Sequence, residues 1–129
     1  MLRLVILNYQ RPENVKKIVF SLWKLFPRIT VINNNPNYSL PYWGGDIDVI
    51  NNNQNYFCME RWIRCFEYPE EYKLIIDDDI LPSPKLIKNM LKSNLPITGV
   101  YGKRGVCTSN SYNELEDVWS DGEVDFLVG

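Results

Sequence analysis

Three consecutive aspartates, Asp77, Asp78 and Asp79, end a short apolar run that begins at Leu74. A run of this length, followed closely by Pro82, is typical of a strand that is buried on both faces. Carboxylates crowded at a strand end repel one another unless a cation or several hydrogen-bond donors lie beside them. In an extended chain, Asp77 and Asp79 point to one side and Asp78 to the other. The pattern therefore predicts a site for a hard divalent cation that prefers oxygen ligands.

Two simpler interpretations of these aspartates stay open. They are also typical of a calcium-stabilised loop, and of an acidic cluster before a helix, which Ser83 and Pro84 predict shortly afterwards. Neither interpretation involves a substrate, so the function depends on what else gathers around the aspartates.

The composition excludes several kinds of chemistry. The chain has 129 residues, a net charge of −2 and no histidine. Ser-His-Asp and Cys-His nucleophiles and His-ligated zinc are therefore excluded. The charge gives no electrostatic reason to expect nucleic acid or an anionic membrane as a partner. No stretch approaches the ~18 apolar residues of a membrane helix and the N-terminus lacks the layout of a secretory signal, so we expect a soluble, cytoplasmic protein without a membrane span.

Strands and helices that alternate along the chain must position the aspartates. Apolar runs bounded by chain-breaking residues predict the strands, and apolar residues at helical spacing predict the helices. Their order indicates one α/β domain with a mostly parallel central sheet flanked by helices. We expect strands at 2–7, 29–32, 47–50, 72–79, 97–101 and 124–128, and helices at 12–26, 57–68 and 84–91.

The helix expected between the third and fourth strands carries two of the three cysteines. Cys58, Trp62, Cys65 and Phe66 follow helical spacing, so we expect them to form its buried face, with Arg61 off that face. Three cysteines without a CxxC pair do not indicate a disulfide framework, and free cysteine is usually a small core residue.

Polar clusters follow the first four expected strands. The first begins at Asn8, and the others are Asn33–Asn35, Asn51–Asn53 and Asp77–Asp79. Such residues can each cap a turn, but ligands of parallel sheets bind outside the carboxyl ends of the strands. Gathered at one edge, the clusters predict a cleft rich in amide groups with the metal site at its centre. The near-repeat of VINNNPNY and VINNNQNY is explained most simply by two parallel strands with similar ends.

This cleft suits a nucleoside diphosphate. The amides of Asn8 and Asn33 match the polar edges of a base or ribose, and the ring of Tyr9 could stack on the base. A cation held by Asp77 and Asp79 could bridge the diphosphate, aided by an arginine. Neither GxGxxG after the first strand nor GxxxxGK[ST] is present, so the sequence predicts no dinucleotide fold and no P-loop.

Five segments follow one another in an order typical of one enzyme family: VILNYQRPENV, ITVINNN, NNNQNYFCMERW, YKLIIDDDILPSP and VDFLVG. Through them the chain resembles nucleotide-sugar glycosyltransferases of the Rossmann-like GT-A fold, especially the domains encoded by large algal (chlorella) viruses. The resemblance implies a single nucleotide-sugar-binding domain over 1–129. It also implies transfer of a sugar from a nucleoside diphosphate sugar, UDP-linked, to a glycan or glycoprotein acceptor. The acceptor-binding part of such enzymes follows a strand like VDFLVG, so we expect that part to be missing from this sequence.

The resemblance also implies roles for individual residues. Asp79 would be the direct ligand of Mn²⁺ or Mg²⁺, with Asp77 at the ribose or in the metal shell and Asp78 facing the donor sugar. Arg61 would lie beside the first aspartates or the diphosphate, and no catalytic base can be assigned. The nucleotide-sugar-binding residues would be Asn8, Tyr9, Arg11, Asn33, Arg61, Asp77 and Asp78.

Two other functions stay open. A non-catalytic nucleotide- or metal-binding module would need only the donor site, and a sugar nucleotidyltransferase would need a glycine-rich basic loop, of which Asn8 to Pro12 offers little. Lys103 and Arg104, between glycines, are typical of a solvated turn, with contact to phosphate or acceptor as the alternative. Trp43 and Trp119 could stack on a sugar or pack against the protein.

Overall fold

The chain divides into two compact units, Met1–Leu81 and Pro82–Gly129. Their association into the one domain expected from the sequence stays a prediction. The computed structural model describes residues 1–93 and 97–99, together with three short strands at 102–104, 116–118 and 126–127.

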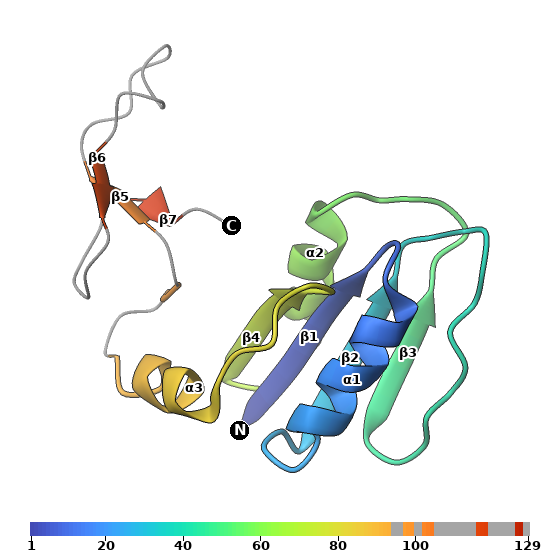
Figure 1. Ribbon diagram of the computed structural model, residues 1–129, viewed down its shortest axis with the longest axis horizontal. Coiled ribbons are helices and arrows are strands. Elements are labelled where there is room, and N and C mark those ends of the chain that lie inside the picture. The colour runs from blue at the N-terminus through green and yellow to red at the C-terminus, as the bar shows by residue number, and fades with distance from the viewer. Residues whose placement is uncertain (94–96, 100–101, 105–115, 119–125, 128–129) are drawn as a thin grey trace. The chain divides into compact units, whose positions relative to one another are not determined.

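The first unit is built on a four-stranded sheet in which all strands are parallel. Its strands are β1 (Leu2–Asn8), β2 (Arg28–Asn33), β3 (Ile47–Asn51) and β4 (Tyr72–Asp77). Their order in the sheet is β3-β2-β1-β4 (Figure 1). The two inner strands, β1 and β2, are the most deeply buried, and Leu4, Val5 and Ile6 of β1 are inaccessible to solvent. The prediction of an α/β fold with a parallel sheet flanked by helices is confirmed for this unit, and the arrangement is compatible with a Rossmann-like fold.

Two helices cover opposite faces of this sheet, α1 (Pro12–Leu22) after β1 and α2 (Met59–Glu67) after β3 (Figure 1). The chain steps one way across the sheet from β1 to β2 and the other way from β3 to β4. Right-handed crossovers then place the two helices on opposite faces. α1 begins at Pro12, a residue favoured in a first helical turn, and ends before Phe26, which is buried outside the helix.

The buried face of α2 differs from the prediction. Cys65 is buried in a core cluster with residues of β1 and β2, as expected. Cys58 and Trp62 are exposed, however, and the side chain of Phe66 is 90% exposed. The prediction was wrong because helical spacing gives the period of an apolar stripe but not the direction in which the stripe points. The ion pair between Arg61 of α2 and Asp77 of β4 decides that direction.

A buried arginine ties the amino-terminal ends of the strands together. Arg3 in β1 donates from Nε and Nη2 to the two carboxylate oxygens of Glu70, at 2.9 Å each. Its Nη1 donates to Thr30 in β2 at 2.7 Å and to Asp48 in β3 at 2.9 Å. The guanidinium carbon lies 3.9 Å from the centre of the Tyr68 ring. One side chain therefore joins three strands to the segment that precedes the fourth.

The described residues of the second unit contain one helix and an antiparallel sheet in the order β6-β5-β7. These late strands are not part of the parallel sheet, contrary to the prediction. Residues 97–99 form no strand, residues 100–101 lie outside the described residues, and Lys103 and Arg104 lie in a strand instead of a turn. None of the helices in the described residues is long and apolar enough to cross a bilayer. The elements are α3 (Pro84–Met90), β5 (Gly102–Arg104), β6 (Glu116–Val118) and β7 (Phe126–Leu127).

We expect Glu70→Gln to lower the free energy of unfolding by about 2–3 kcal/mol, because the variant leaves a buried guanidinium without its charged bidentate partner. Urea unfolding at neutral pH measures the loss. Glu71→Gln changes an exposed neighbouring carboxylate in the same way and serves as the control. Equal stability of the two variants would contradict the role assigned to Arg3.

The same pair predicts a pH dependence. The hydrogen bond from Arg3 lowers the pKa of Glu70 below its ordinary value of 4.5. A carboxyl group with a lowered pKa in the folded state contributes stability above its unfolded pKa and loses it as the pH falls through the folded value. The stability difference between the wild-type chain and Glu70→Gln should therefore be full at neutral pH and shrink below pH 4.5. A stability difference between the two proteins that increases as the pH is lowered would contradict this prediction.

Candidate functional site

Strand β4 ends at Asp77, two residues earlier than predicted. The chain then turns, and the N–H of Ile80 donates to the carbonyl of Asp77 at 3.2 Å. Because Asp78 and Asp79 lie in this turn, strand alternation no longer governs the direction of their side chains. The three carboxylates consequently have different surroundings.

The first aspartate pairs with α2 across one face of the sheet. Arg61 Nη1 donates to Asp77 Oδ1, so the arginine lies beside the first aspartate, as expected. The Arg61 side chain is almost completely buried, and its Nε has no hydrogen-bond partner in the described part of the chain. Arg64 lies about one turn after Arg61 in α2, and its Nε donates to the buried carboxylate of Glu60 at 2.9 Å. The ion pair of Arg61 with Asp77 turns this side of α2 toward the sheet, whereas the pair of Arg64 with Glu60 lies within the helix.

The second aspartate is buried and holds the loop between β1 and α1. Asp78 Oδ2 accepts the backbone N–H groups of Tyr9, Gln10 and Arg11, at 3.1, 3.4 and 3.3 Å. Its Oδ1 accepts from Arg11 Nη1 at 2.9 Å, and this hydrogen bond raises the pKa of Arg11. The carboxylate thus points into the loop, and does not face outward as contact with a donor sugar would require.

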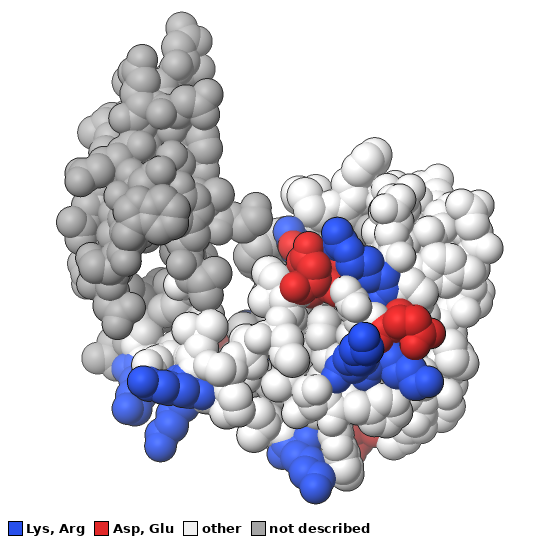
Figure 2. Space-filling view, in the orientation of Figure 1, with Lys and Arg blue, Asp and Glu red and all other residues white. Residues whose placement is uncertain are grey.

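The third aspartate is the most accessible. Asp79 Oδ2 accepts from the same Arg11 Nη1 at 3.1 Å, and half of its side chain is exposed. Asp77 and Asp79 are therefore each paired with an arginine, but with different ones. Acidic and basic side chains accordingly lie beside one another on this side of the unit, and do not form a patch of one sign (Figure 2).

The asparagines at the strand ends bind mainly to one another. Asn8 and Asn33 are fully buried, and Asn8 Nδ2 donates to Asn33 Oδ1 at 2.9 Å. Asn33 Nδ2 donates in turn to Asn51 Oδ1 at 3.0 Å, and the Asn51 amide exchanges two hydrogen bonds with the backbone of Leu40. Binding of a nucleoside by Asn8 and Asn33 stays a prediction, since in this structure their side chains face the protein interior.

The register of the sheet explains the near-repeat in the sequence. Val31, Ile32 and Asn33 of β2 pair in order with Val49, Ile50 and Asn51 of β3. Identical residues therefore lie side by side on neighbouring parallel strands, which confirms the explanation drawn from the sequence.

A second row of asparagines fixes the segment that leads into α2. Asn52 Nδ2 donates to Asn34 Oδ1 at 2.7 Å, and Asn34 Nδ2 donates to the carbonyl of Phe57 at 2.9 Å. The N–H of Phe57 donates to Asn55 Oδ1 at 2.8 Å. Phe57 has a φ of 56°, a strained value for a bulky residue, and it needs such hydrogen bonds to persist. This row of asparagines thereby fixes the start of α2, and with it the position of Arg61.

The backbone of Tyr9 is held from three directions while its ring stays exposed. Its carbonyl accepts from Asn35 Nδ2 at 2.8 Å and from the Tyr38 hydroxyl at 3.0 Å, and its N–H donates to Asp78. The Tyr38 hydroxyl also accepts from Asn8 Nδ2 at 2.8 Å. These hydrogen bonds fix the backbone of Tyr9, and stacking of its exposed ring on a base stays a prediction.

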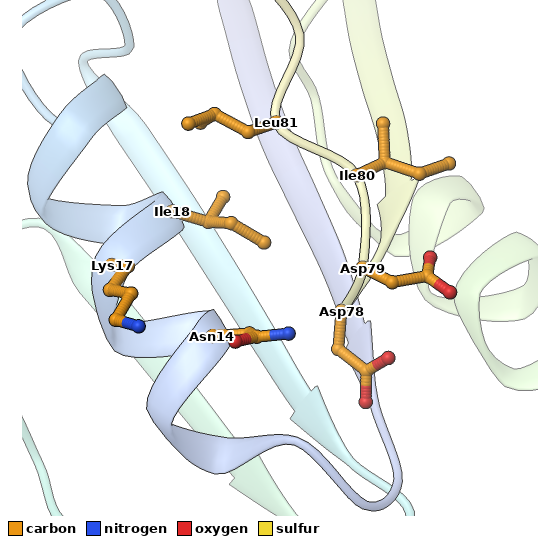
Figure 3. A pocket seen from close by; sticks show the side chains of 7 residues that line it. All are labelled: Asn14, Lys17, Ile18, Asp78, Asp79, Ile80 and Leu81. Carbon is orange, nitrogen blue, oxygen red and sulfur yellow. The ribbon is translucent and has the colours of Figure 1, made fainter.

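A small cavity of about 140 Å³ lies next to the aspartates, between α1 and the residues after β4 (Figure 3). Ile18, Ile80 and Leu81 line one part of it, and Asn14 points toward Asp78 in the other. Pockets for whole small-molecule ligands usually measure roughly 300–1,000 Å³. This cavity is therefore too small to enclose a whole small-molecule ligand.

The described side chains fit a metal site only in part. In the residues described, no group of three or more acidic or cysteine side chains is arranged to hold a metal ion. Asp77 and Asp79 nevertheless offer two partly exposed carboxylates at one edge. Mg²⁺ is commonly bound by one or two carboxylates together with substrate phosphates and water, and Mn²⁺ prefers similar oxygen ligands. A cation held by this pair and completed by a diphosphate stays a prediction.

No role was predicted for Tyr38, and Asn51 and Asp78 were predicted at this edge with roles different from those that the structure shows. Tyr38 and Asn51 hold the asparagine network, and Asp78 holds the loop, although the sequence assigned Asp78 to the donor sugar. The in-register repeat was the available signal for Asn51, because it places Asn33 and Asn51 on neighbouring strands.

Comparison with known proteins gives no relative. A scan against protein-family models found no match, and neither a search of curated proteins nor a search of solved structures found one. The function has to be inferred from the residues of this chain.

The different surroundings of Asp78 and Asp79 predict different mutational effects. Asp78→Asn should lower the free energy of unfolding by about 2 kcal/mol, because a buried carboxylate loses its charge beside Arg11 and three backbone donors. Asp79→Asn, at a side chain that is 51% exposed, should change it by at most about 0.5 kcal/mol. Chemical unfolding of both variants measures the difference. A larger loss of stability in Asp79→Asn than in Asp78→Asn would show that Asp78 is not the residue that holds the loop.

Proposed function

We propose that the chain is the donor-binding domain of a metal-dependent glycosyltransferase that moves a sugar from a nucleoside diphosphate sugar, UDP-linked, to a glycan or glycoprotein acceptor. One observation carries the proposal: two accessible carboxylates, Asp77 and Asp79, lie with two arginines, Arg61 and Arg11, at the carboxyl edge of a parallel sheet. Carboxylates attract a divalent cation, and guanidinium groups bind phosphate oxygens. A diphosphate is the ligand that uses both.

The chain's own residues divide the work of binding. Arg61 and Arg11 would hold the diphosphate oxygens, and Asp79 and Asp77 would hold Mn²⁺ or Mg²⁺. When bound, the cation would neutralise the charge that grows on the departing diphosphate. Tyr9 would stack on the base, and Asp78 acts as a positioning residue, because it fixes the loop that presents Tyr9 and Arg11.

A second candidate is a non-catalytic module that binds a nucleotide and a metal ion. All three carboxylates of the turn are paired with arginines, so none of Asp77, Asp78 and Asp79 is free to serve as a general base. That pairing is the observation in its favour.

Binding is tested by calorimetry with UDP, with and without Mn²⁺. We expect binding that depends on Mn²⁺ and is lost when the metal is chelated. Asp79→Ala should weaken it by about tenfold or more without lowering the melting temperature. Asp46→Ala is the matched control, since Asp46 is an exposed aspartate paired with Arg28 away from this edge. Unchanged Mn²⁺-dependent affinity of Asp79→Ala would remove Asp79 as a metal ligand, and no metal-dependent binding at all would defeat both candidates.

Catalysis is tested by donor hydrolysis. If the domain is an enzyme, water should slowly replace the acceptor, so that the bond between the anomeric carbon and the diphosphate oxygen breaks and free sugar and UDP appear. The rate should fall in Asp79→Ala and in the metal-free protein. Tight binding of UDP without any released sugar would favour the non-catalytic module.

A further inference from the structure

Helix α2 presents its apolar side chains to solvent. Met59, Trp62, Ile63 and Phe66 are 58%, 46%, 52% and 90% exposed. They follow the spacing of one helical face and define what is here called the α2 stripe. A surface helix of a globular protein normally buries such a face against its own core. In α2 the arrangement is the reverse.

The helix cannot turn to bury the α2 stripe in its own unit. Arg61 is paired with Asp77, Arg64 with buried Glu60, and Cys65 packs into the core under the sheet. Arg64 and Glu60 lie in the same helix and would rotate together, but rotation would separate the nearly buried Arg61 from Asp77 and take Cys65 out of the core, which is unfavourable. The α2 stripe is therefore a stable feature of the surface of this unit.

The size of the α2 stripe matches one half of a small protein interface. From the exposed fractions and aromatic side-chain areas of 150–250 Å², the four residues expose roughly 500 Å² of apolar surface. This lies within the range of the largest apolar patch of a typical monomer, roughly 300–600 Å², which is often functional. Two such surfaces together approach the lower limit of a specific interface, about 1,200 Å² in total, once rim residues are added.

We propose that the α2 stripe binds the α2 stripe of a second copy of this chain, with the two helices antiparallel about a two-fold axis. The spacing of the four residues is symmetric about the midpoint between Trp62 and Ile63. In such a pair, Met59 faces the partner's Phe66 and Trp62 faces the partner's Ile63. A large side chain then lies opposite a smaller one at every position, as close packing requires.

The charges beside the α2 stripe allow this pairing. Glu67 is the exposed acid next to it, and Arg64 of the same helix donates to it at 3.0 Å. In an antiparallel pair the two Glu67 side chains lie at opposite ends of the helices, about 13 Å apart for nine residues at 1.5 Å each. The pairing therefore brings no like charges together at the centre of the interface. A self-complementary interface requires this, because each residue near the two-fold axis lies close to its own copy. The inference is independent of what the sheet edge binds.

The oligomeric state tests the proposal. Sedimentation velocity of the full chain should give twice the chain mass of 15.2 kDa at high protein concentration and half of that on dilution. Phe66→Glu should remain monomeric at every concentration. Phe20→Glu is the matched control, because Phe20 is a phenylalanine on the outside of α1 that is 56% exposed, and this variant should still dimerise. Circular dichroism of both variants verifies that they fold.

Mixing two variants tests the antiparallel register. In a mixed pair of Phe66→Glu and Met59→Lys, the new glutamate faces the new lysine at one position and the native pair remains at the other. We expect the mixture to regain dimers that Phe66→Glu alone does not form. If Phe66→Glu is monomeric and mixing restores nothing, the antiparallel pairing is overturned.

Two other results would overturn the proposal. A wild-type chain that stays at 15.2 kDa at all concentrations, with Phe66→Glu lowering its melting temperature, would show that the α2 stripe is covered within the same chain. Equal dimerisation of Phe66→Glu and Phe20→Glu would show that the dimer uses another surface.

Discussion

Polar groups that leave water when the chain folds are costly to bury without a hydrogen-bond partner, and in this chain that cost shapes both ends of the sheet. At the amino-terminal end, Arg3 cannot be buried in β1 unless carboxylates and a hydroxyl reach it from other segments. At the carboxyl end, the aspartates and asparagines that follow the strands satisfy one another, the arginines and the loop backbone. The apolar core between the two ends supplies most of the burial, whereas these contacts determine which loops lie where.

The same requirement limits the proposed site to fewer groups than the sequence predicts. Asp78, Asn8 and Asn33 are buried, and their hydrogen bonds hold loops in place. What faces outward is a smaller set: the ring of Tyr9, the carboxylates of Asp77 and Asp79, and the side chain of Arg11, whereas Arg61 is nearly buried beside Asp77. The hydrogen bonds of the buried residues fix the loops that carry this set, although Asn8 Oδ1 and Arg61 Nε have no partner among the described residues.

The sequence predicts the parallel sheet well because a short, continuous apolar run such as Leu2 to Leu7 has to be buried on both faces, as the strands of a parallel sheet are. The position of Arg61 beside the first aspartates followed only from the family resemblance, because helical spacing alone is equally typical of a charge on the outer side of the helix. Arg3 and Glu70 could not be paired in this way, because 67 positions separate them and neither belongs to a motif. The end of β4 was misplaced for a local reason: three identical aspartates give no signal of where an extended chain begins to turn. In the second unit, the strand Gly102–Arg104 was taken for a turn, because glycines on both sides of two charges suggest one.

The orientation of α2 connects the site to the surface on the opposite side of the helix. Arg61 can reach Asp77 only if the charged side of the helix faces the sheet, and then Trp62 and Phe66 must face away from it. If the helix instead buried its aromatic residues, as its hydrophobic spacing alone would favour, the arginine would leave the sheet edge and Asp77 would lose its partner. The ion pair at the carboxyl edge and the exposed α2 stripe thus both result from the orientation of the helix about its own axis. A partner that covers the stripe would offset the cost of exposing it, and would at the same time stabilise the rotation that keeps Arg61 beside Asp77.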